Sequence, residues 1–184
     1  MYKRDEITII DNFLSSEKFK KLSNEFFDEN RRWRIVPSIH VYDAGKEHCM
    51  NPKYDVQGVD LLFHYLEPEI SEEKLYPLAP IFSKLKVSKK QITKVKANCN
   101  FCRSENYVSG FHVDVEKRYL ENGMTAIFYL NTNDGKTLFE TGEEIESIEN
   151  RIVIFPNQMR HAPMWQTDCA RRVILNINWD LTES

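Results

Sequence analysis

The second half of this 184-residue chain alternates short β-prone runs with turn residues, and this pattern constrains the fold more than any other feature. Several short strands at close, regular spacing are typical of an antiparallel barrel or sandwich. Their number fits a jelly roll, in which two antiparallel sheets face each other. The expected strands span residues 95–101, 125–131, 137–140, 144–147, 151–155, 162–166 and 172–178.

The first half of the chain has the periodicity of helices. Ser15 is expected to cap a helix whose apolar face begins at Phe19 and recurs at helical spacing. A second helix is expected over residues 72–86, with Pro77 and Pro80 in or before its first turn, where a missing N–H is tolerated.

Three further features complete the expected fold. Residues 6–10 suggest a short strand, and residues 40–60 and 103–110 suggest loops, because turn-forming residues recur there without a period. Asn-Asp-Gly at 133–135 suggests a hairpin turn, since Asp-Gly supplies the positive φ angles that tight hairpins need. The predicted class is therefore α+β and mainly β: a double-stranded β-helix, or jelly roll, with supporting N-terminal helices.

The length favours one domain over residues 1–184, with helical support and substrate loops in about 1–94 and the jelly-roll core in about 95–180. The net charge of −3 and the pI near 6.0 argue against a broad nucleic-acid-binding surface. No apolar run has the length of a signal-peptide core or a membrane span, so we expect a cytoplasmic protein. Disulfides are then not expected, and the Cys99–Cys102 pair lacks the second pair of a zinc ribbon.

Two residues in the middle of the chain are candidate metal ligands. His112 and Asp114 are two positions apart, so on an extended segment both side chains point to the same side. An imidazole and a carboxylate provide two-thirds of the facial triad that binds Fe(II). His161 is the only histidine after Asp114 and therefore the candidate third ligand, although a buried or surface histidine without a ligand role is the alternative.

The remaining histidines, His40, His48 and His64, have no spacing that requires a metal, and we treat them as non-ligands.

A metal-bound keto acid would need a cation for its far carboxylate, and arginine suits this role because its guanidinium makes two parallel hydrogen bonds. Arg171 and Arg172 open the last strand, and only one of them can point inward. Arg172 is favoured because it shares a face with polar residues, whereas Arg171 shares the apolar face. Tyr129 and Asn131 could donate hydrogen bonds to the same carboxylate; the alternative is an ordinary barrel strand with a satisfied core tyrosine.

Together, these motifs resemble the 2-oxoglutarate- and Fe(II)-dependent oxygenase superfamily, on the prolyl-4-hydroxylase-like branch. The chain is especially similar to short forms often encoded by phages and marine microbes. The resemblance covers nearly half the chain, from residue 95 to 180. It is carried by FHVD at 111–114, TAIFYLNTNDGKTLFE at 125–140, ENRIVIFP at 149–156, His161, and RRVILNINW at 171–179.

The resemblance implies a role for each matched residue. His112, Asp114 and His161 would be the iron ligands. Arg172 would pair with the distal carboxylate of 2-oxoglutarate, although the adjacent Arg171 leaves that assignment open by one position. Tyr129 would donate a hydrogen bond to the same carboxylate.

Asn98 matches an asparagine that is frequent in the short forms. The first 94 residues match no motif, so the substrate stays open.

The implied activity is hydroxylation of an unactivated C–H bond, coupled to conversion of 2-oxoglutarate and O2 to succinate and CO2, with ascorbate as a candidate reductant. Asp114 favours hydroxylation, because related halogenases lack this carboxylate. Proline, as a peptidyl or free amino acid, is the first candidate substrate. The alternatives are another small molecule, a nucleobase, or no catalysis at all in a cupin-like module that binds metal or sugar.

Two exposed segments could contact a substrate: the basic cluster at 31–34 and a possible lid at 116–119. The alternative for both is a solvated loop.

Overall fold

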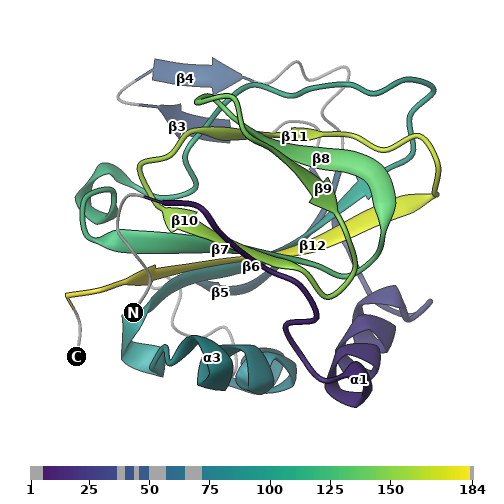
Figure 1. Cartoon of the computed structure of the whole chain (residues 1–184), viewed down its shortest axis with the longest axis horizontal. Helices are drawn as coiled ribbons and strands as arrows, with labels where there is room; N and C mark the ends of the chain where they lie inside the picture. Colours follow the sequence, from purple (N-terminus) through teal and green to yellow (C-terminus); the bar gives the residue numbers. More distant parts are fainter. Residues whose placement is uncertain (1–5, 37–39, 44–45, 50–56, 65–71, 183–184) are drawn as a thin grey trace.

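Two antiparallel sheets face each other across the molecule, with helices along the outer face of the larger sheet (Figure 1). The computed structural model describes residues 6–36, 40–43, 46–49, 57–64 and 72–182. In spatial order the large sheet contains β1 (Thr8–Ile10), β10 (Ile152–Pro156), β7 (Gly123–Tyr129), β12 (Arg171–Asp180), β6 (Ile92–Phe101), β5 (Gln57–His64) and β2 (Arg34–Val36).

The smaller sheet contains three strands, and a separate hairpin contains two. The smaller sheet runs in the order β11 (His161–Met164), β8 (Asn133–Phe139) and β9 (Glu144–Ser147), and the hairpin pairs β3 (His40–Asp43) with β4 (Lys46–Cys49). This arrangement confirms the predicted jelly roll. The expected strand 144–147 coincides with β9, and the other expected strands of the second half overlap β6, β7, β8, β10, β11 and β12.

The helices α1 and α3 lie under the large sheet (Figure 1). The helical segments of the described residues are α1 (Ser16–Phe27), α2 (Glu72–Leu75), α3 (Ala79–Leu85) and the 3₁₀ turns η1 (Tyr76–Leu78), η2 (Lys89–Gln91) and η3 (Lys117–Tyr119). Ser15 is the N-cap residue of α1, but its side chain makes no capping hydrogen bond. No helix in the described residues has the length and apolar character needed to cross a membrane.

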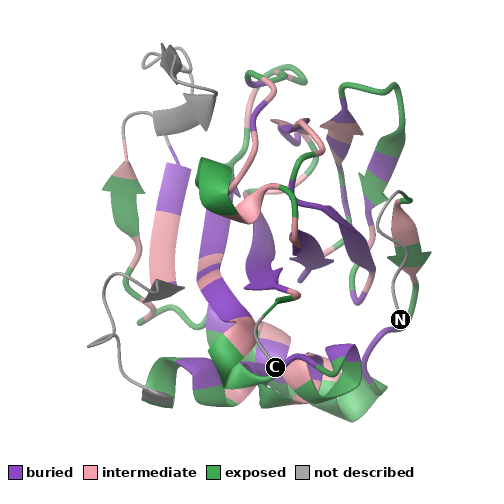
Figure 2. Ribbon diagram, turned by 90° about the vertical axis from the view of Figure 1, so that its left-hand side faces the viewer, coloured by how far each residue is buried: buried purple, intermediate pink, exposed green. Residues whose placement is uncertain are grey.

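The strand alternation divides the interior into an apolar and a polar side. On β12, Val173, Leu175 and Ile177 are fully buried and pack in the core between the large sheet and the helices. The intervening residues face the smaller sheet and include the buried Arg172 and Asn176. Figure 2 shows the burial: buried residues dominate the central strands, whereas the helices mix buried and exposed positions. One face of the sheet therefore supplies stability and the other can carry chemistry.

Two expectations for the first half of the chain are wrong in detail. The helix expected over 72–86 is interrupted, because Pro77 and Pro80 lack the N–H that a continuous helix uses, and the 3₁₀ turn η1 separates α2 from α3. The loop expected over 40–60 contains β3, β4 and the start of β5. These strands form through pairing between strands, although their sequence shows no clear alternation of apolar and polar residues.

The hairpin turn expected at 133–135 is also wrong, because these residues open strand β8. The turn between β8 and β9 instead contains Gly142, whose φ of +107° only glycine adopts readily. Gly135 has a different role, because neighbouring atoms approach its backbone closely. A Cβ there would lie 2.9 Å from the Cδ atom of Arg172 and 2.9 Å from the carbonyl oxygen of Met164.

Asn150 ties the N-terminal segment to the jelly roll. Its backbone is left-handed, with φ of 59°, and its buried side chain accepts from the Leu14 N–H and donates to the Leu14 carbonyl, both at 2.8 Å.

We expect Asn150→Ala to lower the free energy of unfolding by about 2–4 kcal/mol, because two buried backbone groups lose their partners. Asn150→Gly should cost roughly 1 kcal/mol less, since glycine adopts the left-handed backbone without strain.

Urea unfolding of both variants would measure these costs. Equal stability of the alanine variant and the wild type would contradict this role for Asn150.

Candidate metal centre

The two histidines lie directly opposite each other in a short antiparallel bridge. His112 precedes the large loop that leads to β7, and His161 is the first residue of β11. Each backbone N–H donates to the carbonyl of the other residue at 2.9 Å. The two imidazole rings are therefore held with their centroids 4.8 Å apart.

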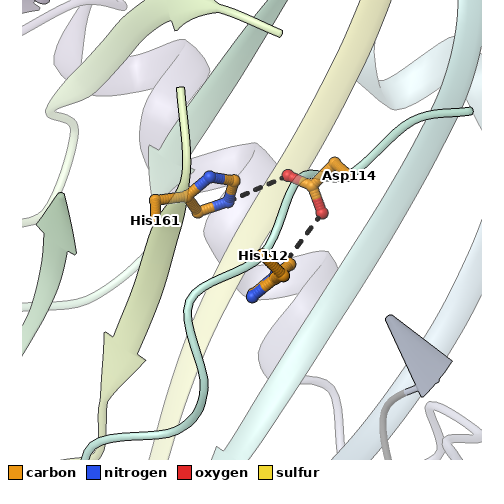
Figure 3. Close-up of side chains that lie close together, drawn as sticks. All are labelled: His112, Asp114 and His161. Atoms are coloured by element: carbon orange, nitrogen blue, oxygen red, sulfur yellow. Dashed lines mark ion pairs between the residues drawn. The ribbon is translucent and has the colours of Figure 1, made fainter. Parts of the chain in front are cut away.

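Asp114 completes the group from two residues further along the same segment. Its Oδ2 atom is 3.0 Å from His161 Nε2, and its Oδ1 atom is 3.8 Å from His112 Nε2 (Figure 3). One ligand atom from each of the three residues lies within 4.8 Å of the others. Two ligands about 2.1 Å from a metal and at right angles to each other are about 3 Å apart, so the spacing suits a facial triad.

Both histidines present Nε2 to this shared point. His112 Nδ1 lies 3.1 Å from the carbonyl oxygen of Gly110, and His161 Nδ1 lies 3.2 Å from that of Met159. A carbonyl only accepts, so Nδ1 of each histidine is the donor in this hydrogen bond, and Nε2 of each histidine is the atom that faces the shared point. Backbone hydrogen bonds of this kind fix the tautomer and orientation of metal-binding histidines.

Electrostatics in the centre favour the protonation states that bind a cation. Burial, reinforced by repulsion from His161, lowers the pKa of His112 to about 4, so its imidazole is neutral at neutral pH. Burial alone would raise the pKa of Asp114, but the two histidines more than offset this and hold it well below its ordinary value. The group therefore offers the neutral imidazole of His112 and the ionised carboxylate of Asp114, with His161 Nε2 beside that carboxylate.

Further hydrogen bonds fix the segment that carries His112 and Asp114. Asn176 on β12 donates to Asp114 Oδ2 at 2.7 Å. Lys94 on β6 donates to the Asp114 carbonyl at 2.9 Å, and Arg160 donates to the Phe111 carbonyl at 2.8 Å. The ligand segment is thus held from both sheets.

The triad opens into a pocket between the two sheets. The cavity volume open to the centres of water-sized molecules is about 30 Å³. Besides the triad, the lining residues are Gln57, Lys96, Asn98, Asn100, Ile127, Thr137, Pro163, Arg172, Ile174 and Asn176.

Arg172 lies fully buried in this pocket and is held by neutral groups. Its Nε donates to Ser147 Oγ at 2.7 Å, and its other nitrogens lie 3.3 Å from Thr137 Oγ1 and 3.4 Å from Asn100 Oδ1. Among the described residues none of its hydrogen-bond partners is a carboxylate. A buried guanidinium without a counter-charge is costly, so the pocket is prepared for an anion.

Arg171 points to the opposite side of the large sheet. Its Nη2 donates to the Phe27 carbonyl at 3.3 Å, and its guanidinium lies 5.1 Å from the centre of the Phe27 ring. The alternation along β12 therefore puts Arg172, and not Arg171, in the pocket with the triad.

Tyr129 and Asn131 are not among the residues that line the pocket, and both side chains have hydrogen-bond partners within the chain. The Tyr129 hydroxyl is buried behind Thr137 and donates to its Oγ1 at 2.7 Å. Asn131 follows the end of β7 and bridges the β12 backbone, donating to the Arg171 carbonyl and accepting from the Val173 N–H. Both residues support the strand that carries Arg172.

Asn98 does line the pocket, and its buried Oδ1 has no hydrogen-bond partner among the described residues.

Lys96 also lines the pocket and was not expected there, although the alternation of β6 is a signal for it. Lys96, Asn98 and Asn100 alternate along β6, so all three side chains face the pocket. Burial, together with repulsion from Lys94, lowers the pKa of Lys96 to about 8, against the opposing attraction of Asp114. Gln57, Thr137 and Ser147 were also missed; they come from strands whose position only the sheet pairing defines.

Other expected residues lie outside the centre or outside the described part. The side chains of His40, His48 and His64 lie outside the described residues. Arg31 is not in a solvated loop, since it pairs with Asp60 at 2.6 Å and its guanidinium lies 3.8 Å from the centre of the Phe26 ring.

Comparison of the fold with solved structures finds similar chains of low sequence identity. A Trichoplax adhaerens prolyl hydroxylase in complex with a hypoxia inducible factor peptide fragment has a TM-score of 0.59 at 14% identity, with 96% of this chain and 84% of that chain covered. The viral collagen prolyl hydroxylase of Paramecium Bursaria Chlorella virus-1, in a 2OG complex, has a TM-score of 0.53 at 16% identity, with 95% of both chains covered.

A third similar structure binds a different kind of molecule. HygX from Streptomyces hygroscopicus, with nickel, 2-oxoglutarate and hygromycin B bound, has a TM-score of 0.58 at 10% identity, with 96% of this chain and 83% of that chain covered. No family model and no curated protein sequence matches the chain. The chain therefore has the fold of prolyl hydroxylases and related 2-oxoglutarate Fe(II) oxygenases.

We expect Asn176→Ala to weaken metal binding by about 10- to 100-fold, because the hydrogen bond that orients the Asp114 carboxylate is lost. Asn178→Ala is the matched control, since Asn178 lies on the same face of β12 but donates to Thr125 instead. Competition with a chelating dye, using Mn(II) or Zn(II), would measure both affinities. Equal losses in the two variants would contradict a specific role for Asn176.

Proposed function

We propose that this protein is an Fe(II)- and 2-oxoglutarate-dependent dioxygenase that hydroxylates an unactivated C–H bond. One observation carries the proposal: a two-histidine, one-carboxylate group and a buried arginine with only neutral described partners line the same pocket. The first suits Fe(II) with open coordination positions. The second suits the distal carboxylate of a bound dicarboxylic acid.

Some residues of the chain would hold the metal, and others would orient the metal ligands and the co-substrate. His112, Asp114 and His161 would hold the metal through atoms that backbone and Asn176 hydrogen bonds already orient. Arg172 would pair with the distal carboxylate of 2-oxoglutarate. Fe(II), 2-oxoglutarate and O2 together supply the oxidant for the C–H bond, with succinate and CO2 as co-products.

Ser147 and Thr137 would set the angle of the Arg172 guanidinium, because both hydroxyls accept its hydrogen bonds. Ile127 and Ile174 form apolar walls beside these polar groups. Such walls limit the access of water to a reactive centre, and the protein supplies binding, orientation and exclusion of water in this way.

The substrate class proposed first is a peptidyl or free amino acid such as proline. Similar folds include prolyl hydroxylases with a peptide or 2-oxoglutarate, but also HygX with hygromycin B bound. Another small molecule is therefore the second candidate. A non-catalytic cupin-like module would explain the triad but not the buried arginine.

Anaerobic titration of the metal-free protein with Fe(II) and 2-oxoglutarate tests the proposal directly. We expect a visible charge-transfer band from chelation, and we expect His112→Ala to abolish it because one of three ligands is lost. A folded wild type that binds Fe(II) and shows no band on addition of 2-oxoglutarate would rule out the oxygenase.

Arg172→Met should weaken 2-oxoglutarate binding by at least roughly 30-fold, because loss of one member of a buried charge pair costs about 2–5 kcal/mol. Arg171→Met is the control and should bind 2-oxoglutarate like the wild type, since Arg171 contacts Phe27 outside the pocket. Calorimetry on the Mn(II)-loaded proteins would measure both. The reverse pattern would assign the role to Arg171.

A further inference from the structure

The pocket has a second cation that the proposed function does not use. Lys96 lies on β6 and lines the pocket beside the triad. It is paired across the sheet with Asn176, whose amide donates to Asp114. Among the described residues Lys96 has no hydrogen bond or ion pair, and its electrostatic neighbours are Lys94 and Asp114.

Lys96 and Arg172 stand at opposite ends of the pocket. Arg172 is paired across the sheet with Asn100, and Lys96 with Asn176, four residues further along β12. At about 3.3 Å per residue, these positions are roughly 13 Å apart. The two cations are therefore two separate sites, one far from Asp114 and one next to it.

Charge in the filled pocket would not balance without a further anion. Fe(II), Arg172 and Lys96 would bring four positive charges, whereas Asp114 and the two carboxylates of 2-oxoglutarate would bring three negative ones. Histidines bind metal ions through neutral rings, and no other described lining residue is charged. One positive charge remains, and a partly buried charge without a partner is unfavourable.

Two amide oxygens next to Lys96 also lack partners. The Oδ1 atoms of Asn98 and Asn176 are buried and accept no hydrogen bond from a described residue. Both residues line the pocket and are more than nine-tenths buried, with 8% and 4% of their surfaces exposed. The Lys96 ammonium group would complement a carboxylate, and the two unused amide oxygens would complement an ammonium or imino group next to that carboxylate. A free α-amino acid has both groups.

We propose that Lys96 binds the carboxylate of the primary substrate, so that the substrate is a small free acid such as an amino acid and not an internal residue of a peptide. This inference rests on the proposed function and narrows its substrate class. Since Lys96 flanks the metal ligands, the bound carboxylate would stand within a few bonds of the carbon that reacts. An internal peptide residue such as proline has no carboxylate at that distance.

Calorimetric titration of the Mn(II)·2-oxoglutarate protein tests this without turnover. The probes are free L-amino acids, beginning with L-proline, each beside its neutral carboxamide. We expect at least one acid to bind the wild type tenfold or more tightly than its amide. Lys96→Met should lose that preference, and Lys96→Arg should restore it, because the charge returns.

Affinity for 2-oxoglutarate identifies which carboxylate Lys96 serves. We expect Lys96→Met to bind 2-oxoglutarate within threefold of the wild type, like the control Lys90→Met at an exposed position of η2. A tenfold loss would assign Lys96 to the co-substrate and overturn the inference. The inference would also be overturned if the acids bound no better than their amides, or if none of the acids bound.

A wild type that binds Mn(II) but not 2-oxoglutarate would instead refute the proposed function, and the inference with it.

Discussion

The antiparallel bridge between His112 and His161 is the constraint on which the candidate centre depends. Two residues that exchange both backbone hydrogen bonds stand about 5.5 Å apart at their Cα atoms, with side chains on the same face. This separation lets both Nε2 atoms reach one metal. Asp114 joins them because it is two residues from His112, and the i, i+2 rule keeps it on that side. The ligand geometry is thus a property of backbone pairing before any metal binds.

The pocket can form because the two faces of the large sheet lie in different environments. Alternate residues of β12 enter either the apolar core against the helices or the polar cavity against the smaller sheet. The apolar side stabilises the fold by burial, whereas the polar side contains the buried polar groups. Arg172 is one of these, since its guanidinium is fully buried among hydroxyl and amide groups. Gly135 then leaves room for its side chain, which a Cβ would crowd.

The polar side chains of the pocket form two groups. Arg172 with Thr137 and Ser147 forms one end, while Lys96 with the unpaired amide oxygens of Asn98 and Asn176 forms the other. The triad lies beside the second end, as the hydrogen bond from Asn176 to Asp114 shows. A co-substrate and a substrate that each bring a carboxylate would fill such a pocket without leaving a buried charge unpaired.

The sequence by itself determined the strand-rich second half, the jelly roll and the residues that meet at the triad, because side-chain alternation with a period of two is a local property of the chain. The same alternation separated Arg172 from Arg171. It could not decide which side chains stand in the pocket and which stand behind it. The hydroxyl of Tyr129, for example, donates to Thr137, which in turn accepts from Arg172.

Lys96 is the converse case, since its place beside Asp114 follows from the pairing of β6 with β12 across the sheet. Cross-strand register joins residues about 80 positions apart, and no local pattern encodes it. Only the tertiary structure therefore decided that the pocket has a second cation next to the metal ligands.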